Sequence, residues 1–224
     1  MDRSALAERY EAIKGSIPDH VTLVAVSKTR SVSEIKAVYD LGHRAFGENY
    51  PQELKEKQPQ LPSDIEWHFI GHLQSNKVKY IAPFVHLVHG VDSIKLLDEL
   101  EKRAKSNHRI QDVLLQVHIA QEETKHGFSH EEIMALFEGT GSDPWPSLRI
   151  RGLMGMASNT DNLEQVRGEF KSLAGLFEVM KKRPGPHRPS FDTLSMGMSG
   201  DADEAISAGS TMVRIGTAIF GNRP

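Results

Sequence analysis

Short apolar runs alternate with amphipathic segments along the whole chain. Residues 3–15 place apolar and charged positions at helical spacing, which predicts a leading helix. The apolar run Leu23-Val24-Ala25-Val26 is typical of a short buried strand. Ser31-Val32-Ser33-Glu34 is then a capping box that opens a second helix, and Gly42 ends that helix. This stretch predicts one complete strand–helix unit.

The same unit recurs to the end of the chain. Further strands are predicted over residues 44–46, 65–70, 85–88, 113–117, 150–154, 191–194 and 211–215, and helices over 52–57, 75–81, 93–104, from 129, 163–180, 202–207 and from 217. Strands that alternate with helices favour right-handed βαβ crossovers and a parallel sheet. The pattern therefore predicts an α/β protein with a single (β/α)8 TIM barrel and a leading N-terminal helix, one domain over residues 1–224. A doubly wound open sheet is the alternative fold.

Loop composition distinguishes the two ends of this barrel. Proline-rich segments at 58–63, 139–147 and 183–190 lie between a helix and the next strand. Polar segments, most of them with glycine, follow strands at 27–29, 47–49, 71–77, 195–200 and 215–217. The loops that follow strands form the active face of a TIM barrel. We therefore expect the functional residues in these segments, although glycine is also common in loops without function.

The composition excludes several classes of protein. The chain has 224 residues, of which 38% are hydrophobic and 25% charged, and this is ordinary for a globular protein. A net charge of −3 gives no general attraction to nucleic acid or anionic membranes. The absence of cysteine excludes disulfides, thiolate metal sites and a cysteine nucleophile. The N-terminus has no apolar signal core, and no run of about 18 apolar residues exists. We expect a soluble, cytoplasmic monomer with no nucleic-acid or membrane partner.

Lys28 lies at the carboxyl end of the first predicted strand. A single lysine at a strand end is most often a solvated charge. It can also be an amine that condenses with a carbonyl group, if partial burial or a nearby cation such as Arg214 lowers its pKa from the usual value of about 10.4. The segments that follow the other strands distinguish these interpretations.

Two loops late in the chain have the composition of a phosphate site. Residues 195–200 follow the seventh strand, and Gly216-Thr217 follows the eighth. TIM barrels frequently bind phosphate with these two loops and a helix N-terminus. Glycines let backbone N–H groups approach an anion, while Ser199 and Thr217 add hydroxyl donors. Small residues could instead only permit tight turns, but the presence of both loops favours phosphate.

A phosphate site beside a strand-end lysine points to pyridoxal 5′-phosphate (PLP), which supplies both an aldehyde and a phosphate. The first and eighth strands of a closed barrel are neighbours, so Lys28 lies near the phosphate loops. Arg214 is a lone charge inside the apolar eighth strand. It could meet the pyridine nitrogen, where it would disfavour ring protonation and weaken the electron sink. A salt bridge at the barrel rim is the alternative role for Arg214.

Other polar clusters give weaker signals. His68 and His72 are four residues apart on a predicted strand and the loop after it, and no acidic third ligand is evident, so we expect no metal site. A charged loop after the fifth strand is more typical of a solvated lid than of a catalytic set: Glu122, Glu123, Lys125 and His126. A basic loop could attract nucleic acid, but it has no interleaved aromatic residues and is typical of a solvated loop: Lys181, Lys182, Arg183, His187 and Arg188.

Together these motifs resemble the YggS/PROSC family of PLP-binding proteins, also called PLP homeostasis proteins. The resemblance runs from about Leu23 to Gly221. It is carried by LVAVSKT at 23–29, FGENY at 46–50, WHFIG at 67–71, LQSNK at 73–77, SMGMS at 195–199 and AGSTMVRIGTAIFG at 208–221.

The resemblance implies an alanine-racemase N-terminal-domain-like barrel that holds PLP through a covalent imine to Lys28. It places the other cofactor-binding residues in the same pocket: Asn49, Ser199, Arg214, Gly216 and Thr217. No enzymatic turnover is established for the family, which is associated with balancing vitamin B6 and amino-acid pools. PLP-dependent apoenzymes are therefore candidate partners.

Three functions are compatible with the sequence. The preferred hypothesis is a non-catalytic PLP carrier or regulator, because a cofactor pocket occurs without an evident acid–base pair. The alternative is a racemase-like enzyme, which needs a second proton-transfer group opposite Lys28; Tyr50 is the nearest candidate by sequence. A cofactor-free RNA- or protein-binding module is supported only by the basic loop.

Overall fold

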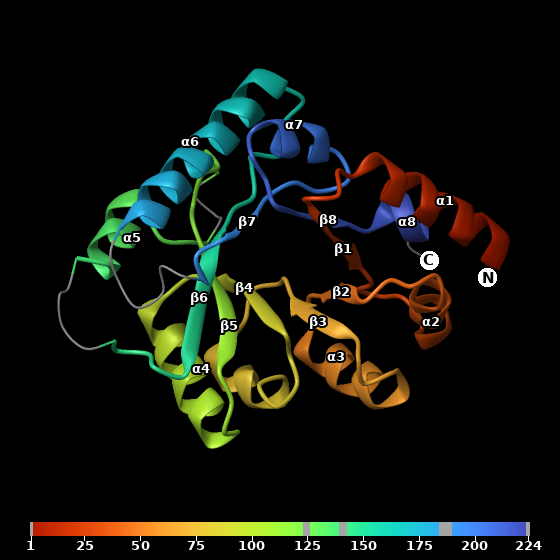
Figure 1. Ribbon diagram of the computed structural model, residues 1–224, viewed down its shortest axis with the longest axis horizontal. Helices are drawn as coiled ribbons and strands as arrows, with labels where there is room; N and C mark the ends of the chain where they lie inside the picture. Colours follow the sequence, from red (N-terminus) through yellow and green to blue (C-terminus); the bar gives the residue numbers. More distant parts are fainter. Residues whose placement is uncertain (1, 123–125, 139–142, 184–189, 223–224) are drawn as a thin grey trace.

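The strands close into a parallel barrel. The computed structural model describes residues 2–122, 126–138, 143–183 and 190–222. Its strands are β1 (Thr22–Val26), β2 (Ala45–Glu48), β3 (Glu66–Phe69), β4 (Leu87–Val91), β5 (Gln111–Gln116), β6 (Leu148–Met154), β7 (Thr193–Ser195) and β8 (Met212–Ile215). Each strand pairs in parallel with the next, and β8 pairs with β1 (Figure 1). The predicted TIM barrel is confirmed, and the open sheet is excluded.

Helices fill the connections and surround the barrel (Figure 1). They are α1 (Arg3–Ser16), α2 (Val32–Asp40), α3 (Pro51–Lys57), α4 (Ile94–Ser106), α5 (His130–Leu136), α6 (Leu163–Lys182), α7 (Ala202–Ser207) and α8 (Thr217–Phe220), with 3-10 helices η1 (Gln58–Gln60) and η2 (Ser75–Tyr80). Both predicted capping boxes form, Ser31 with Glu34 and Ser129 with Glu132. Within the described residues, no helix has the length and apolar character needed to cross a membrane.

Several element boundaries differ by a few residues from the sequence-based expectation, and in two elements hydrogen bonds explain the difference. Residues 75–80 form a 3-10 helix rather than an α-helix, because the N–H of Lys77 donates to the carbonyl of Gln74 at 2.9 Å, three residues back. The fourth strand begins at Leu87 rather than at residue 85, since the N–H of Val85 is bonded to the preceding turn at Ile81. An irregularity in the pairing with β5 then extends this strand to Val91.

Apolar side chains pack in two layers. The larger cluster lies between the strands and the surrounding helices. Strand residues alternate between the two faces of the sheet, and a second cluster is drawn from strand positions on the inner face: Val24, Ala45, Leu87, Leu114, Met154 and Met212. The barrel interior is therefore filled with side chains, and little space is left for a ligand within the layer itself.

The first and last helices lie side by side (Figure 1). Leu6 and Tyr10 of α1 are buried, and Arg9 Nε donates to the carbonyl of Ile219 in α8 at 2.9 Å. The predicted leading helix thus packs beside α8, which directly follows β8 and the predicted phosphate loop.

Candidate functional site

One cavity at the carboxyl ends of the strands brings together all six residues predicted from the sequence. Its volume is about 290 Å³, and its walls include Lys28, Asn49, Ser199, Arg214, Gly216 and Thr217, together with Val26, Arg30, Ile70, Met156, Met198 and Gly200. The loops after β1, β2, β7 and β8 supply these six residues or lie next to them. Direct pairing of β1 with β8 sets Val24 opposite Arg214. Their contacts with a ligand remain predictions.

The backbone turns sharply directly after Lys28. The strand ends at Val26, and Thr29 has a φ of 64°, a left-handed conformation that is uncommon for a β-branched residue. The Thr29 N–H donates to Glu53 Oε1 at 2.6 Å, and the Arg30 N–H donates to the Ser27 carbonyl at 3.0 Å. These bonds hold the turn, which leaves half-buried Lys28 in the cavity wall.

A buried ionic network supports this turn. Lys57 Nζ lies 2.7 Å from Glu48 Oε1 and 2.6 Å from Glu53 Oε1, and it donates to the Ser27 carbonyl at 2.9 Å. The Ser27 hydroxyl donates to Glu48 Oε1 at 2.6 Å. Burial raises the pKa of the Glu48 carboxyl, and the Lys57 ammonium opposes that rise. Lys57 therefore connects the loop after β1 to the end of β2.

Arg214 is buried rather than salt-bridged at the rim. Its side chain is 4% exposed, Nη1 donates to Ser195 Oγ at 2.7 Å, and Nη2 donates to the Gly155 carbonyl at 3.2 Å. No ion pair to Arg214 occurs among the described residues. Burial lowers the pKa of the guanidinium to about 10, against the opposing charge of Asp201. Arg214 thus remains a cation at neutral pH in the wall of the cavity.

A chain of buried polar side chains continues from Arg214 into the barrel. Ser195 Oγ lies 3.0 Å from His89 Nδ1, and His89 Nε2 lies 2.9 Å from His68 Nδ1. Burial lowers the pKa of His89 well below its usual value and that of His68 to about 3, so both imidazoles are neutral. Each neutral ring has one donor and one acceptor nitrogen, so the proton positions along the chain are coupled. Sequence reasoning missed this chain, which crosses from β8 to β7, β4 and β3.

Two polar groups at the cavity have a weak hydrogen bond or no hydrogen bond within the described residues. Asn49 Oδ1 is buried and has no hydrogen-bond partner among the described residues. The Gly216 N–H makes a long bond of 3.4 Å to Ser199 Oγ. A Cβ at Gly216 would lie 3.1 Å from the carbonyl oxygen of Val26, so a glycine permits this close approach of β1 and β8. Because α8 has four residues, it offers backbone N–H groups rather than a strong helix dipole.

The donor set fits a cofactor that has both an aldehyde and a phosphate. Lys28, Arg30 and Arg214 make the wall cationic, and hydroxyl and N–H donors come from the loops after β7 and β8. Sequence reasoning did not identify Arg30, whose side chain pairs with Glu34 at 3.5 Å and lies over the Phe220 ring. An amine, an anion-binding wall and an unpaired acceptor at Asn49 therefore meet in one cavity.

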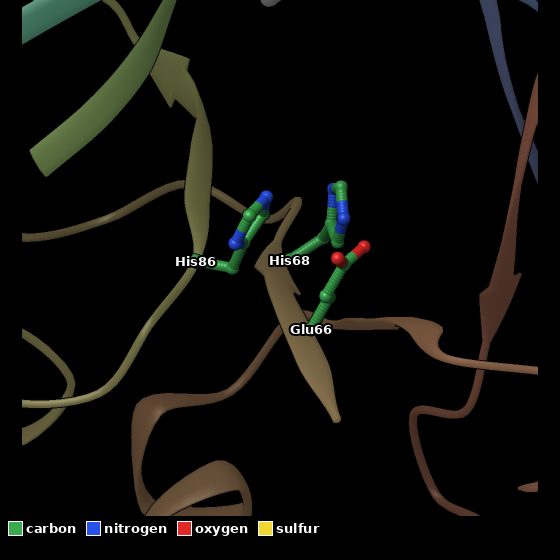
Figure 2. A group of neighbouring side chains, drawn as sticks. All are labelled: Glu66, His68 and His86. Atoms are coloured by element: carbon green, nitrogen blue, oxygen red, sulfur yellow. The ribbon is translucent and has the colours of Figure 1, made fainter. Parts of the chain in front are cut away.

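The expectation of no metal site rested on an incorrect premise. His68 and His72 do not share a cluster, but each has an acidic neighbour. Glu66 groups with His68 and His86 (Figure 2), and Asp92 groups with His72 and His126. Glu66 could have been found from the sequence, because a residue two positions from His68 on a predicted strand shares its face. Asp92 could not, because it comes from a different loop.

None of the described residues of the two charged loops is among those that line the cavity. Glu123, Lys125, His187 and Arg188 lie outside the described residues. Glu122 accepts a bond from the Asn159 N–H at 2.9 Å, so it joins two loops instead of being only solvated. Lys181 and Lys182 are exposed at the end of α6, as expected for a solvated segment.

The barrel and its site define the class of protein. The family model described as "Alanine racemase, N-terminal domain" matches residues 1–224. Pyridoxal phosphate homeostasis protein of Haemophilus influenzae is 43% identical over 206 residues, 91% of this chain and 85% of that protein. Pyridoxal phosphate homeostasis protein of Escherichia coli K12 is 39% identical over 213 residues, 93% of this chain and 88% of that protein. The chain therefore belongs to the YggS/PROSC family of pyridoxal phosphate homeostasis proteins, within the alanine-racemase N-terminal-domain class.

Solved structures agree with this assignment. PipY of Synechococcus elongatus, with PLP bound, has a TM-score of 0.82 and 30% identity, covering 96% of this chain and 100% of that chain. Alanine racemase from Bartonella henselae has a TM-score of 0.72 at 15% identity, which shows the fold alone. This chain covers 62% of the racemase.

Proposed function

We propose that this protein binds PLP on Lys28 and contributes to the homeostasis of PLP and amino acids. The observation that carries the proposal is the cavity that combines the Lys28 amine with the anion-binding groups of the loops after β7 and β8. The names of the bacterial relatives and the PLP-bound structure of PipY support the same cofactor.

Each residue has a role in this proposal. Lys28 would hold the cofactor through a covalent bond from Nζ to the aldehyde carbon, with loss of water. Ser199, Gly216 and Thr217 would donate to the phosphate, and Asn49 Oδ1, which has no hydrogen-bond partner among the described residues, would accept a hydrogen bond. PLP supplies an electrophilic aldehyde and an electron-withdrawing ring. Arg214 is a cation in the cavity wall, and a guanidinium beside the ring nitrogen would disfavour protonation of that nitrogen.

We further propose that the protein is a carrier or regulator rather than a racemase. Within the described part of the chain, the cavity wall has no histidine, tyrosine or acidic residue that could serve as a second base opposite Lys28. Tyr50, the candidate second base, is 54% exposed and lines an adjoining hollow with His72 and Lys77. In this account the protein is a cytoplasmic monomer that retains PLP and passes it to PLP-dependent apoenzymes.

Absorbance of the purified protein with added PLP tests the site. The account predicts a near-visible band that borohydride removes, and loss of this band in Lys28→Ala. Lys77→Ala is the matched control, because Lys77 lines the adjoining hollow, and it should retain the band. Equal labelling of Lys28→Ala and the parent protein would exclude Lys28 as the attachment point.

An assay with single enantiomers of amino acids tests the carrier role. We expect no sustained interconversion by the PLP-loaded protein. Sustained racemisation that is lost in Lys28→Ala would establish the enzymatic alternative.

A further inference from the structure

A second cluster of ligand-type side chains lies at the amino-terminal end of the barrel. Glu66 and His68 are two residues apart on β3, so they share one face of the strand. His86 directly precedes β4, and its N–H donates to the Trp67 carbonyl at 2.8 Å. The potential ligand atoms of Glu66, His68 and His86 all lie within 4.8 Å of one another. Figure 2 shows the Glu66 carboxylate close to the His68 ring, with His86 just before the neighbouring strand β4.

One nitrogen of His68 has no partner among the described residues. The residue is 2% exposed, and its Nδ1 already contacts His89 Nε2 at 2.9 Å. Its Nε2 is buried and makes no hydrogen bond to any described residue. A buried polar atom left unsatisfied costs about 1–3 kcal/mol, so such atoms are rare in folded proteins. A ligand at Nε2 would supply the missing interaction.

We propose that Glu66, His68 and His86 bind a divalent transition-metal ion of the zinc class. Two imidazoles and one carboxylate suit Zn²⁺, whereas Mg²⁺ and Ca²⁺ prefer oxygen ligands alone. Three protein ligands leave a fourth position for water. A metal on His68 Nε2 also places the proton on Nδ1, which then donates to His89; metal-bound histidines typically have such a second hydrogen bond.

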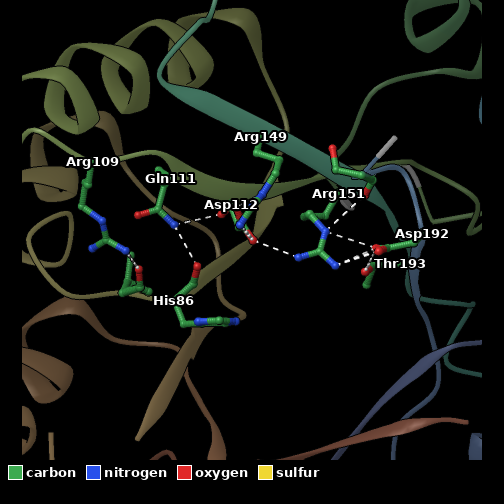
Figure 3. Close-up of polar contacts among 10 residues, drawn as sticks. His86, Arg109, Gln111, Asp112, Arg149, Arg151, Asp192 and Thr193 are labelled. Atoms are coloured by element: carbon green, nitrogen blue, oxygen red, sulfur yellow. Dashed lines mark hydrogen bonds and ion pairs between the residues drawn. The ribbon is translucent and has the colours of Figure 1, made fainter. Parts of the chain in front are cut away.

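Around the proposed metal site, hydrogen bonds hold the backbone, whereas two of the three ligand side chains are exposed. Gln111 Nε2 donates to the His86 carbonyl at 3.2 Å, and Arg109 Nη2 donates to the Val85 carbonyl at 2.7 Å (Figure 3). These bonds hold the segment that carries His86. The side chains of Glu66 and His86 are exposed, so they can rotate toward His68 and reach the metal–ligand distances of about 2.0–2.2 Å that zinc requires.

The other histidine cluster lacks the decisive feature. His72 Nδ1 already lies 3.0 Å from Asp92 Oδ2, and the His72 ring stacks on His126 at 4.4 Å between centroids. None of these three residues has a buried atom without a partner in the described part of the chain. His72 therefore provides a matched control.

Titration of the full chain, free of any polyhistidine tag, with Zn²⁺ in a calorimeter tests the proposal. We expect one ion per chain, with affinity reduced at least about 10-fold in His86→Ala and in Glu66→Gln, because even outer-shell substitutions cost about 10–100-fold. Both altered side chains are exposed, so folding should be preserved. His72→Ala should bind like the parent. Absence of binding by the parent, unchanged affinity in His86→Ala, or loss of binding in His72→Ala would overturn the proposal.

Discussion

At the scale of single residues, Arg214 joins the cavity to the interior of the barrel. Its guanidinium is buried, and Ser195 Oγ and a backbone carbonyl accept its hydrogen bonds in place of a carboxylate. Because these partners are uncharged and no carboxylate forms an ion pair with Arg214 among the described residues, its positive charge remains at the cavity wall. That charge is what makes the proposed site a poor electron sink, since a cation disfavours protonation of the ring.

Ser195→Ala should weaken this arrangement. Arg214 and His89 would each lose a partner, so we expect the free energy of unfolding to fall by about 1–3 kcal/mol and PLP to bind less tightly. Urea denaturation and PLP titration measure the two effects. Ser210→Ala is the control, because the buried Ser210 hydroxyl donates to backbone carbonyls and does not line the cavity. It should lower stability and leave PLP affinity unchanged; unchanged PLP affinity in Ser195→Ala would contradict the role given to Arg214.

His43 should make stability depend on pH. Burial lowers the pKa of His43 to about 4, below the usual value of about 6.5. Between these values the unfolded chain binds more protons, so stability falls as the pH drops from about 6.5 to about 4, by roughly 3 kcal/mol from this residue.

The variant His43→Gln tests this pH dependence. The introduced amide does not titrate and can donate to the Ala45 carbonyl, which His43 Nε2 contacts at 2.8 Å. Between pH 7.5 and pH 4, the free energy of unfolding of the variant should depend less steeply on pH than that of the parent. The difference in free energy between parent and variant at pH 7.5 measures the loss of packing. A slope equal to that of the parent would refute the assignment.

At the scale of elements, α3 supports the turn that presents Lys28. Lys57 extends from the end of α3 into the space between Ser27 and Glu48. Its side chain is 8% exposed, and that of Glu48 is fully buried. A charged helix end thus fixes the ends of two strands.

Lys57→Met should be costly because it leaves the Glu48 charge buried and unpaired. Loss of one partner of a buried pair costs about 3–5 kcal/mol. The double variant Glu48→Gln/Lys57→Met removes the unpaired Glu48 charge, so it should regain much of the lost free energy of unfolding. Chemical denaturation measures this free energy. If the two single changes were additive, the pair would not be energetically coupled.

The sequence predicted local features of these elements better than contacts between them. Capping boxes at Ser31 and Ser129 depend on residues three apart, so their helices were located correctly. The 3-10 geometry of η2 and the start of β4 depend on bonds to Gln74 and Ile81 that apolar periodicity does not reveal. All six predicted site residues line one cavity because strand ends converge in a closed barrel. Arg30 and Lys57 were not identified from the sequence, and only the fold shows that they are buried.

At the scale of the molecule, the two ends of the barrel have different chemistry. The carboxyl end holds the cationic cavity. At the amino end, Asp112 accepts from Arg149 at 2.6 Å and from Arg151 at 3.0 Å, and Arg151 also pairs with Asp192 (Figure 3). These ion pairs lie at the same end of the barrel as the histidine cluster. The hydrogen-bonded chain from Arg214 through Ser195 and His89 to His68 crosses the apolar interior and links the two ends.

The most direct test of the central claim is to locate the attached cofactor. PLP-loaded protein is reduced with borohydride, digested with a protease and analysed by mass spectrometry. The account predicts one major pyridoxyl modification, on the peptide that contains Lys28. Modification mainly at another lysine, such as Lys57 or Lys77, would contradict it.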